Sequence, residues 1–172
     1  KMDVKDIRVL IKAKVYKSLV NSLFVLILFC VDRFSKIYVI ELSEKKDITE
    51  VYLTSFLNSY LVWNTGIAFG LFSLSNELIY HLFTTLIVLI NLIIIYLVTI
   101  TKDFRKYFFL LILGGSFGHL FDRLYYRSVP DFIDFHIGNF HWFIFNMADI
   151  FITVGVICLI LAELLYKKET NG

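Results

Sequence analysis

Proline and cysteine are scarce in this sequence of 172 residues, which contains one proline, two cysteines and eight glycines. So few glycines and prolines exclude a collagen-like or low-complexity chain. Two cysteines are too few for a disulfide scaffold. Cys30 and Cys158 both lie inside apolar runs, where we expect buried packing residues that say nothing about the redox compartment.

Apolar residues are abundant instead, at 58% of the chain, and the mean hydropathy is +0.74. Soluble domains contain about 45–50% apolar residues. A soluble fold of this size has too little interior to bury so much apolar surface. The high apolar content also excludes intrinsic disorder. The sequence therefore predicts an all-α polytopic membrane protein that forms a single domain over residues 1–172.

Four apolar runs have about the 20 residues that a spanning helix needs, at residues 16–40, 78–100, 107–126 and 145–166. The first run could also belong to a signal peptide. Asp32 and Arg33 stand near its end in place of a small-residue cleavage site, so we expect a retained span. No run shows the alternation over about ten residues that is typical of β-barrel strands.

Basic residues cluster beside these runs and predict their orientation. Both termini and the turn at 101–106 are expected in the cytoplasm, with segments 41–75 and 127–144 outside. A nucleic-acid surface is the alternative, but each cluster abuts an apolar run, so we expect no nucleic-acid partner. The clusters consist of Lys1, Lys5, Arg8, Lys12, Lys14, Lys17, Lys102, Arg105, Lys106, Lys167 and Lys168.

The two outside segments differ in pattern. Residues 51–57 and 59–63 are rich in strand formers and lead into an Asn64-Thr65-Gly66 turn, which predicts a small curved sheet on the membrane surface. Residues 128–143 contain Trp142 and several phenylalanines, which are favoured at a membrane interface. We expect this second segment to be an interfacial lid over the site.

Charged residues are costly at membrane depth and are therefore candidates for function. Six polar residues lie at the same end of three predicted helices, where they can converge: Asp32, Lys36, Asp122, Arg123, Asn146 and Asp149. Structural roles stay open for most of them. Asp32 and Lys36 have the spacing of a helical ion pair, Asn146 could be a helix cap, and Asp122 with Arg123 could be a cap and a snorkelling arginine.

Asp149 and two aspartates outside this group have different settings. Asp149 has no basic residue within four positions, which favours a functional role. Asp131 follows Pro130, the only proline, which stiffens the chain before it; a turn or capping aspartate is the alternative. Asp134 has no such setting and is interpreted as an ordinary surface carboxylate.

The glycines and histidines support packing rather than metal chemistry. Gly114 and Gly118 form a small-xxx-small pair, which predicts close helix packing. His119 lies one turn before Asp122, but no zinc-binding helical motif is present, so no metal and no cofactor are expected. Helical ligand spacing to acidic partners is also missing for His81, His136 and His141. A serine nucleophile lacks its motif as well.

A pair of carboxylates remains as the chemical signal. Such a pair can hydrolyse a peptide bond when one ionised aspartate accepts a proton from water and the other, still protonated, polarises the carbonyl. Two close carboxylates share a proton because both cannot ionise cheaply. A site of low dielectric constant at the membrane edge strengthens that coupling.

Five motifs in order resemble lipoprotein signal peptidase, the type II signal peptidase family of bacteria. They are VDRFSK at 31–36, NTGIAFG at 64–70, GGSFGHLFDR at 114–123, VPDF at 129–132 and FNMAD at 145–149. The resemblance covers nearly the whole chain. It implies a four-span aspartic endopeptidase of the inner membrane with an extracytoplasmic β-cradle. Its substrates would be prolipoproteins, cleaved just before a cysteine that carries diacylglycerol.

The resemblance also implies roles for residues. Asp131 and Asp149 match the catalytic dyad. Substrate-contacting or supporting positions are expected at Asn64, Gly66, His119, Asp122, Arg123 and Asn146. Structural support is expected from Asp32, Lys36, Gly114 and Gly118. The implied partners are a lipid-modified prolipoprotein, membrane lipids and a cyclic peptide inhibitor of the globomycin type.

Two positions depart from the family pattern. His119 stands where the family usually has asparagine; a neutral imidazole can replace one hydrogen bond, but it is larger and can become charged. Pro130 replaces a branched apolar residue. A proton-coupled transporter with relay carboxylates and a non-catalytic membrane chaperone are the rival functions. Neither explains the five ordered motifs, and the run at 78–100 contains no charged residue.

Overall fold

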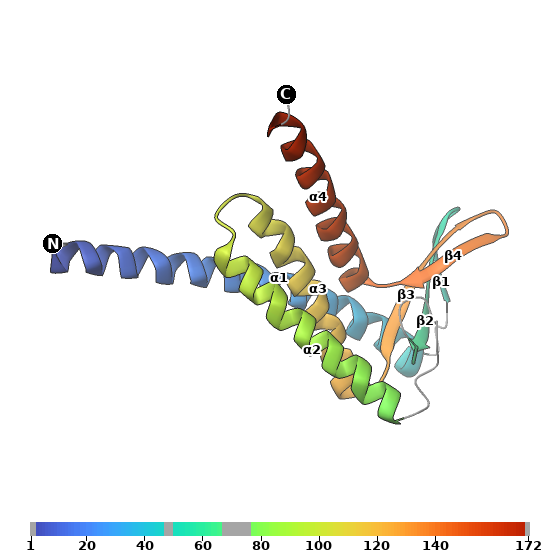
Figure 1. Ribbon diagram of the computed structural model, residues 1–172. Coiled ribbons are helices and arrows are strands. Elements are labelled where there is room, and N and C mark those ends of the chain that lie inside the picture. The colour runs from blue at the N-terminus through green and yellow to red at the C-terminus, as the bar shows by residue number, and fades with distance from the viewer. Residues whose placement is uncertain (1–2, 47–49, 67–76, 171–172) are drawn as a thin grey trace.

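The computed structural model describes residues 3–46, 50–66 and 77–170. Figure 1 shows the strands gathered at one end of the helices, with the first part of α1 extending beyond the others at the opposite end. Residues 67–70 of the second motif lie outside the described part. Within it the elements are, in order, α1 (Val4–Lys46), β1 (Glu50–Thr54), β2 (Leu57–Asn64), α2 (Glu77–Ile100), α3 (Arg105–Tyr126), β3 (Val129–Ile137), β4 (Phe140–Phe145) and α4 (Met147–Thr170).

The four helices lie where the apolar runs predict them. Among the described residues, two helical segments are long and apolar enough to cross a membrane, Glu77–Ile100 in α2 and Met147–Leu165 in α4. The first predicted span, 16–40, lies inside the much longer α1. Residues 4–46 contain neither proline nor glycine, so nothing in the local sequence ends this helix earlier. The described residues are therefore mostly helical, with a small sheet, and two of their helices suit a membrane protein.

All four strands form one antiparallel sheet in the order β1-β2-β3-β4. The predicted curved sheet is present as β1 and β2. Residues 128–143, the predicted interfacial lid, form β3 and most of β4, and their role as a lid stays a prediction. Gly138, which has a positive φ of 60°, lies in the turn between them. Pairing of β3 with β2 then joins the two segments that are predicted to lie outside into a single sheet.

Helix α3 is the central helix and packs against α1, α2 and α4. Its glycines allow close approach. A Cβ on Gly115 would lie 2.5 Å from the carbonyl oxygen of Ala148, and one on Gly114 would lie 2.7 Å from the Cβ of Leu28. A Cβ on Gly118 would collide with the carboxylate of Asp32. These positions agree with the close packing that the small-xxx-small pair predicts.

A buried ionic cluster ties α1 to α3. Lys36 Nζ lies 2.8 Å from Asp32 Oδ1 and 2.6 Å from Asp122 Oδ2, and all three side chains are fully buried. Arg33 pairs with both carboxylates. Asp32 Oδ1 also accepts a 3.0 Å hydrogen bond from the backbone N–H of Ala148 in the first turn of α4. The predicted Asp32–Lys36 ion pair exists, and Asp122 extends it across helices.

We expect Lys36→Met to destabilise the protein strongly. The substitution leaves two buried carboxylates facing each other without the ammonium between them, and breaking a buried pair in this way costs about 3–5 kcal/mol. The free energy of unfolding in detergent measures the effect. Lys12→Met is the matched control, because Lys12 is exposed on the same helix. Equal stability of the two variants would contradict the supporting role of the cluster.

Candidate active site

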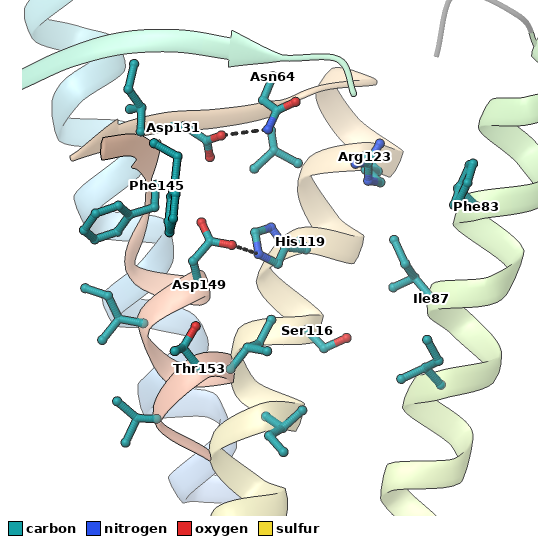
Figure 2. Close-up of a pocket in the computed structure, with 18 of the residues that line it drawn as sticks. Asn64, Phe83, Ile87, Ser116, His119, Arg123, Asp131, Phe145, Asp149 and Thr153 are labelled. Atoms are coloured by element: carbon teal, nitrogen blue, oxygen red, sulfur yellow. Dashed lines mark hydrogen bonds and ion pairs between the residues drawn. The ribbon is translucent and has the colours of Figure 1, made fainter. Parts of the chain in front are cut away.

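Asp131 and Asp149 come from different elements and line the same cavity (Figure 2). Asp131 is the third residue of β3, which begins at Val129. Val129 precedes Pro130, and a residue before proline favours the extended conformation of a strand. Asp149 is the third residue of α4. The β3–β4 hairpin separates them in sequence and returns the chain, so that the start of α4 lies beside β3.

Asn146 connects the two aspartates directly. Its Nδ2 donates to Asp131 Oδ1 at 2.6 Å, and its backbone N–H donates to Asp149 Oδ2 at 3.0 Å. Its Oδ1 accepts the backbone N–H groups of Ala148, at 2.9 Å, and Asp149, at 3.3 Å. These reciprocal bonds form a capping box at the start of α4. The predicted cap therefore exists, and it also holds both carboxylates.

The end of β2 holds the other side of Asp131. Asn64 Nδ2 donates to Asp131 Oδ2 at 2.9 Å, while Asn64 Oδ1 accepts the backbone N–H of Gly66 at 2.9 Å. Arg123 is buried and donates to the carbonyl oxygen of Gly66 from α3. Arg123 thus braces the turn that carries Asn64 and does not snorkel toward solvent.

His119 contacts Asp149 from α3. Its Nε2 lies 3.0 Å from Asp149 Oδ1, and both side chains are only partly buried. Figure 2 shows the imidazole beside the Asp149 carboxyl group, with Ser116 one turn earlier in α3. Asp149 therefore has one oxygen on His119 and the other on the backbone of Asn146, which restrains the orientation of its carboxyl group.

The environments of the two carboxyl groups differ. Asp131 is buried, and this burial, helped by the negative charge of Asp149, raises the pKa of its carboxyl to about 6 against the opposing hydrogen bonds from Asn64 and Asn146. Asp149 lies in the first turn of α4, where the helix dipole favours a negative charge. Asp131 is thus suited to hold a proton, and Asp149 is suited to be ionised.

The cavity beside the pair has a volume of about 840 Å³. Asn64, His119, Arg123, Asp131 and Asp149 lie toward one end of the cavity, with Ser116 and Thr153 farther from that end (Figure 2). The walls are apolar side chains of α2, α3, α4, β3 and β4. Figure 2 shows Phe83 and Ile87 of α2 across the cavity from the aspartates. The other apolar wall residues include Leu86, Ile90, Ile112, Ile150 and Ile152.

The predicted site and support residues divide into two layers. Asn64, His119, Arg123, Asp131 and Asp149 line the cavity. A second layer lies behind them without lining it and consists of Asp32, Lys36, Asp122, Gly114 and Gly118. The two layers meet at α4, since the first turn of this helix is bonded to both.

The interpretation of Asp134 as a surface carboxylate is wrong. Asp134 is fully buried, its Oδ2 lies 2.9 Å from His141 Nδ1, and the ring of His136 is also close. Helical spacing does not place Asp134 on one face with His136. In a strand, residues two apart share a face, so the Asp134-x-His136 spacing was the available signal.

Comparisons with known proteins agree with this geometry. The family described as signal peptidase (SPase) II matches residues 24–165. A lipoprotein signal peptidase of Pelagibacter ubique (strain HTCC1062) is 50% identical over 152 residues, 88% of this chain and 92% of that protein. One of Anaplasma phagocytophilum (strain HZ) is 38% identical over 91% of this chain and 99% of that protein.

A solved structure of a bacterial membrane enzyme has the same fold. It superimposes with a TM-score of 0.71 at 29% identity, over 89% of this chain and 92% of the other. Two helices of this chain are apolar enough to cross a membrane. Together with these similarities, they identify a bacterial membrane protein. Because the family matches most of the chain, the protein belongs to the signal peptidase II family.

Proposed function

We propose that this chain is an intramembrane aspartic endopeptidase that removes the signal peptide from prolipoproteins. Asp131 and Asp149 are its catalytic pair, and cleavage falls just before a cysteine that carries diacylglycerol. The observation that carries the proposal is a pair of carboxyl groups bonded to one asparagine at the polar end of an apolar cavity. Membership of a peptidase family argues against the transporter alternative.

The roles of the pair follow from their environments. Asp149 accepts a proton from water as the water oxygen attacks the scissile carbonyl carbon, and Asp131 gives its proton to the carbonyl oxygen. The resulting gem-diol collapses when Asp149 returns its proton to the leaving cysteine nitrogen and the C–N bond breaks. Asp131 recovers a proton from a diol hydroxyl. Asn64, Asn146 and His119 position the carboxyl groups throughout.

The apolar walls suit a lipid-modified substrate. Acyl chains on the substrate cysteine would lie along α2 and α4, while the peptide backbone meets the polar end of the cavity. Each buried CH₂ contributes about 0.8 kcal/mol to such binding. A cyclic peptide of the globomycin type would compete for the same space.

Four spans complete the proposal. The charged residues of α1 and α3 neutralise one another in the buried ionic cluster, so these helices can cross the bilayer beside α2 and α4. The termini and the Thr101–Lys106 turn face the cytoplasm of an inner membrane, as the basic clusters favour. The sheet and the catalytic pair then lie at the outer face, and residues 1–172 act as one domain.

Loss of either aspartate should abolish cleavage. Asp131→Asn and Asp149→Asn keep the shape of the side chain but cannot exchange the proton, so we expect turnover to fall on the order of 10⁴-fold or more, with no further loss in the double variant. Cleavage of a diacylated precursor peptide in detergent measures the rate. Asp103→Asn, a change at an exposed aspartate in the α2–α3 turn, should keep full activity. Substantial cleavage by Asp149→Asn would rule out the aspartic mechanism.

Lipid on the substrate should control the rate. A precursor peptide with an unmodified cysteine leaves the apolar walls without acyl chains, so we expect much slower cleavage than for the diacylated peptide of the same sequence. Competition between the two peptides, followed by mass spectrometry of the products, gives the ratio of kcat/KM directly. Equal kcat/KM values for the two peptides would contradict positioning by the lipid, but they would leave the aspartic chemistry intact.

The proposed orientation predicts opposite labelling of two single cysteines. Ser55→Cys in the β1–β2 turn should react with a membrane-impermeant maleimide added to intact spheroplasts. Lys102→Cys in the α2–α3 turn should react only after permeabilisation. Both changes are made after Cys30 and Cys158 are replaced by alanine, and the cysteine-free chain is the control. Labelling of both positions from outside would contradict the four-span topology.

A further inference from the structure

We propose that Asp134, His136 and His141 bind a divalent transition metal ion of the Zn²⁺ class on the β3–β4 hairpin. One ligand atom from each residue can be chosen such that all three lie within 4.8 Å of one another. The three residues are separate from the catalytic pair and do not line the cavity. The hairpin that carries them extends from the sheet, away from the helices (Figure 1).

The strand register brings the three side chains together. His136 and His141 are directly opposed partners in the β3–β4 ladder, and their rings are stacked with centroids 5.0 Å apart. Asp134 is two residues before His136 on the same strand and therefore shares its face. His141 Nδ1 lies 2.9 Å and His136 Nδ1 lies 3.5 Å from the same oxygen, Asp134 Oδ2.

An unsatisfied buried nitrogen points to a ligand. His136 is only 8% exposed, and its Nδ1 is buried without a hydrogen-bond partner in the described part of the chain. Leaving a buried polar atom unpaired is costly, so such atoms usually have a partner. Asn58, which opposes Asp134 across β2 and β3, also has a buried Oδ1 with no such partner among the described residues.

A proton alone does not satisfy this arrangement. If His141 pairs with Asp134, as its 2.9 Å contact indicates, the buried Nδ1 of His136 stays unpaired, and charging both stacked rings would place two cations side by side. A metal ion replaces those protons and accepts lone pairs from both rings and the carboxylate. Two imidazoles and one carboxylate are ligands that Zn²⁺ prefers, and they leave a fourth position open.

The required movement is small. Zinc ligands lie about 2.0–2.1 Å from the metal, which in a tetrahedron separates the ligand atoms by roughly 3.4 Å. Asp134 and His136 are buried and held in β3, while 53% of the His141 side chain is exposed and can rotate to close the site. A water molecule in the fourth position could donate a hydrogen bond to Asn58 Oδ1.

Metal binding would link β4 to β3, the strand that carries Asp131. Asp134 follows Asp131 by three residues, and β4 contributes Trp142 and Phe143 to the cavity wall. An ion bound across the two strands would therefore hold this wall in place. The site itself depends on the hairpin geometry and not on the proposed peptidase activity.

Zinc binding to the full chain tests the proposal without an activity assay. The protein is purified in detergent, stripped with a chelator and titrated with ZnCl₂ by calorimetry, and bound zinc is counted by elemental mass spectrometry. We expect about one Zn²⁺ per chain and a higher melting temperature with zinc. His141→Ala should weaken binding by roughly 100-fold or more, because even an outer-shell partner is worth about 10–100-fold.

His81→Ala is the matched control, since His81 is an exposed histidine on α2 outside the cluster, and it should bind zinc as the wild type does. Co²⁺ bound to the wild type gives a visible spectrum that reports four-coordinate geometry and needs no variant. No zinc bound by the folded wild type would overturn the proposal. Equal binding by wild type and His141→Ala would also overturn it, as an adventitious ion only.

Discussion

The lysine between two buried aspartates is the interaction on which the site depends. Lys36 joins Asp32 of α1 to Asp122 of α3, and Asp32 reaches the backbone of Ala148 in α4. Charges at this depth are costly unless they are fully paired, so the three helices are held in one arrangement. Gly118 permits the approach, because any larger side chain would displace the Asp32 carboxylate.

That arrangement determines where the proposed catalytic pair, Asp131 and Asp149, can form. The bond to Ala148 fixes the first turn of α4, and the same turn contains Asn146 as cap and Asp149 as its reciprocal partner. Asn146 then reaches Asp131 on the sheet. One capping box therefore orients a helix and a pair of carboxyl groups. It also separates their environments, with Asp131 buried and Asp149 at the positive end of a helix.

The sheet contributes side chains to the site as well as supporting it. Its β2 end supplies Asn64 to Asp131, its β4 strand forms part of the cavity wall, and its hairpin gathers an aspartate with two histidines. Membrane-facing helices offer apolar walls and few polar side chains, so the polar groups of the site come largely from the strands and from the helix ends that meet them. This division explains why the cavity has one polar end.

The sequence by itself determined the helices, the first two strands, the family and the identity of the candidate residues. Apolar runs, strand formers at 51–63 and five ordered motifs are local signals. Only the tertiary structure decided that β3 pairs with β2, that Asp122 shares Lys36 with Asp32, and that Asp134 is buried against His141. Each of these depends on partners far apart in sequence or across a hairpin. Strand register and helix packing bring them together, and the local pattern of one segment does not identify the partner residues in another segment.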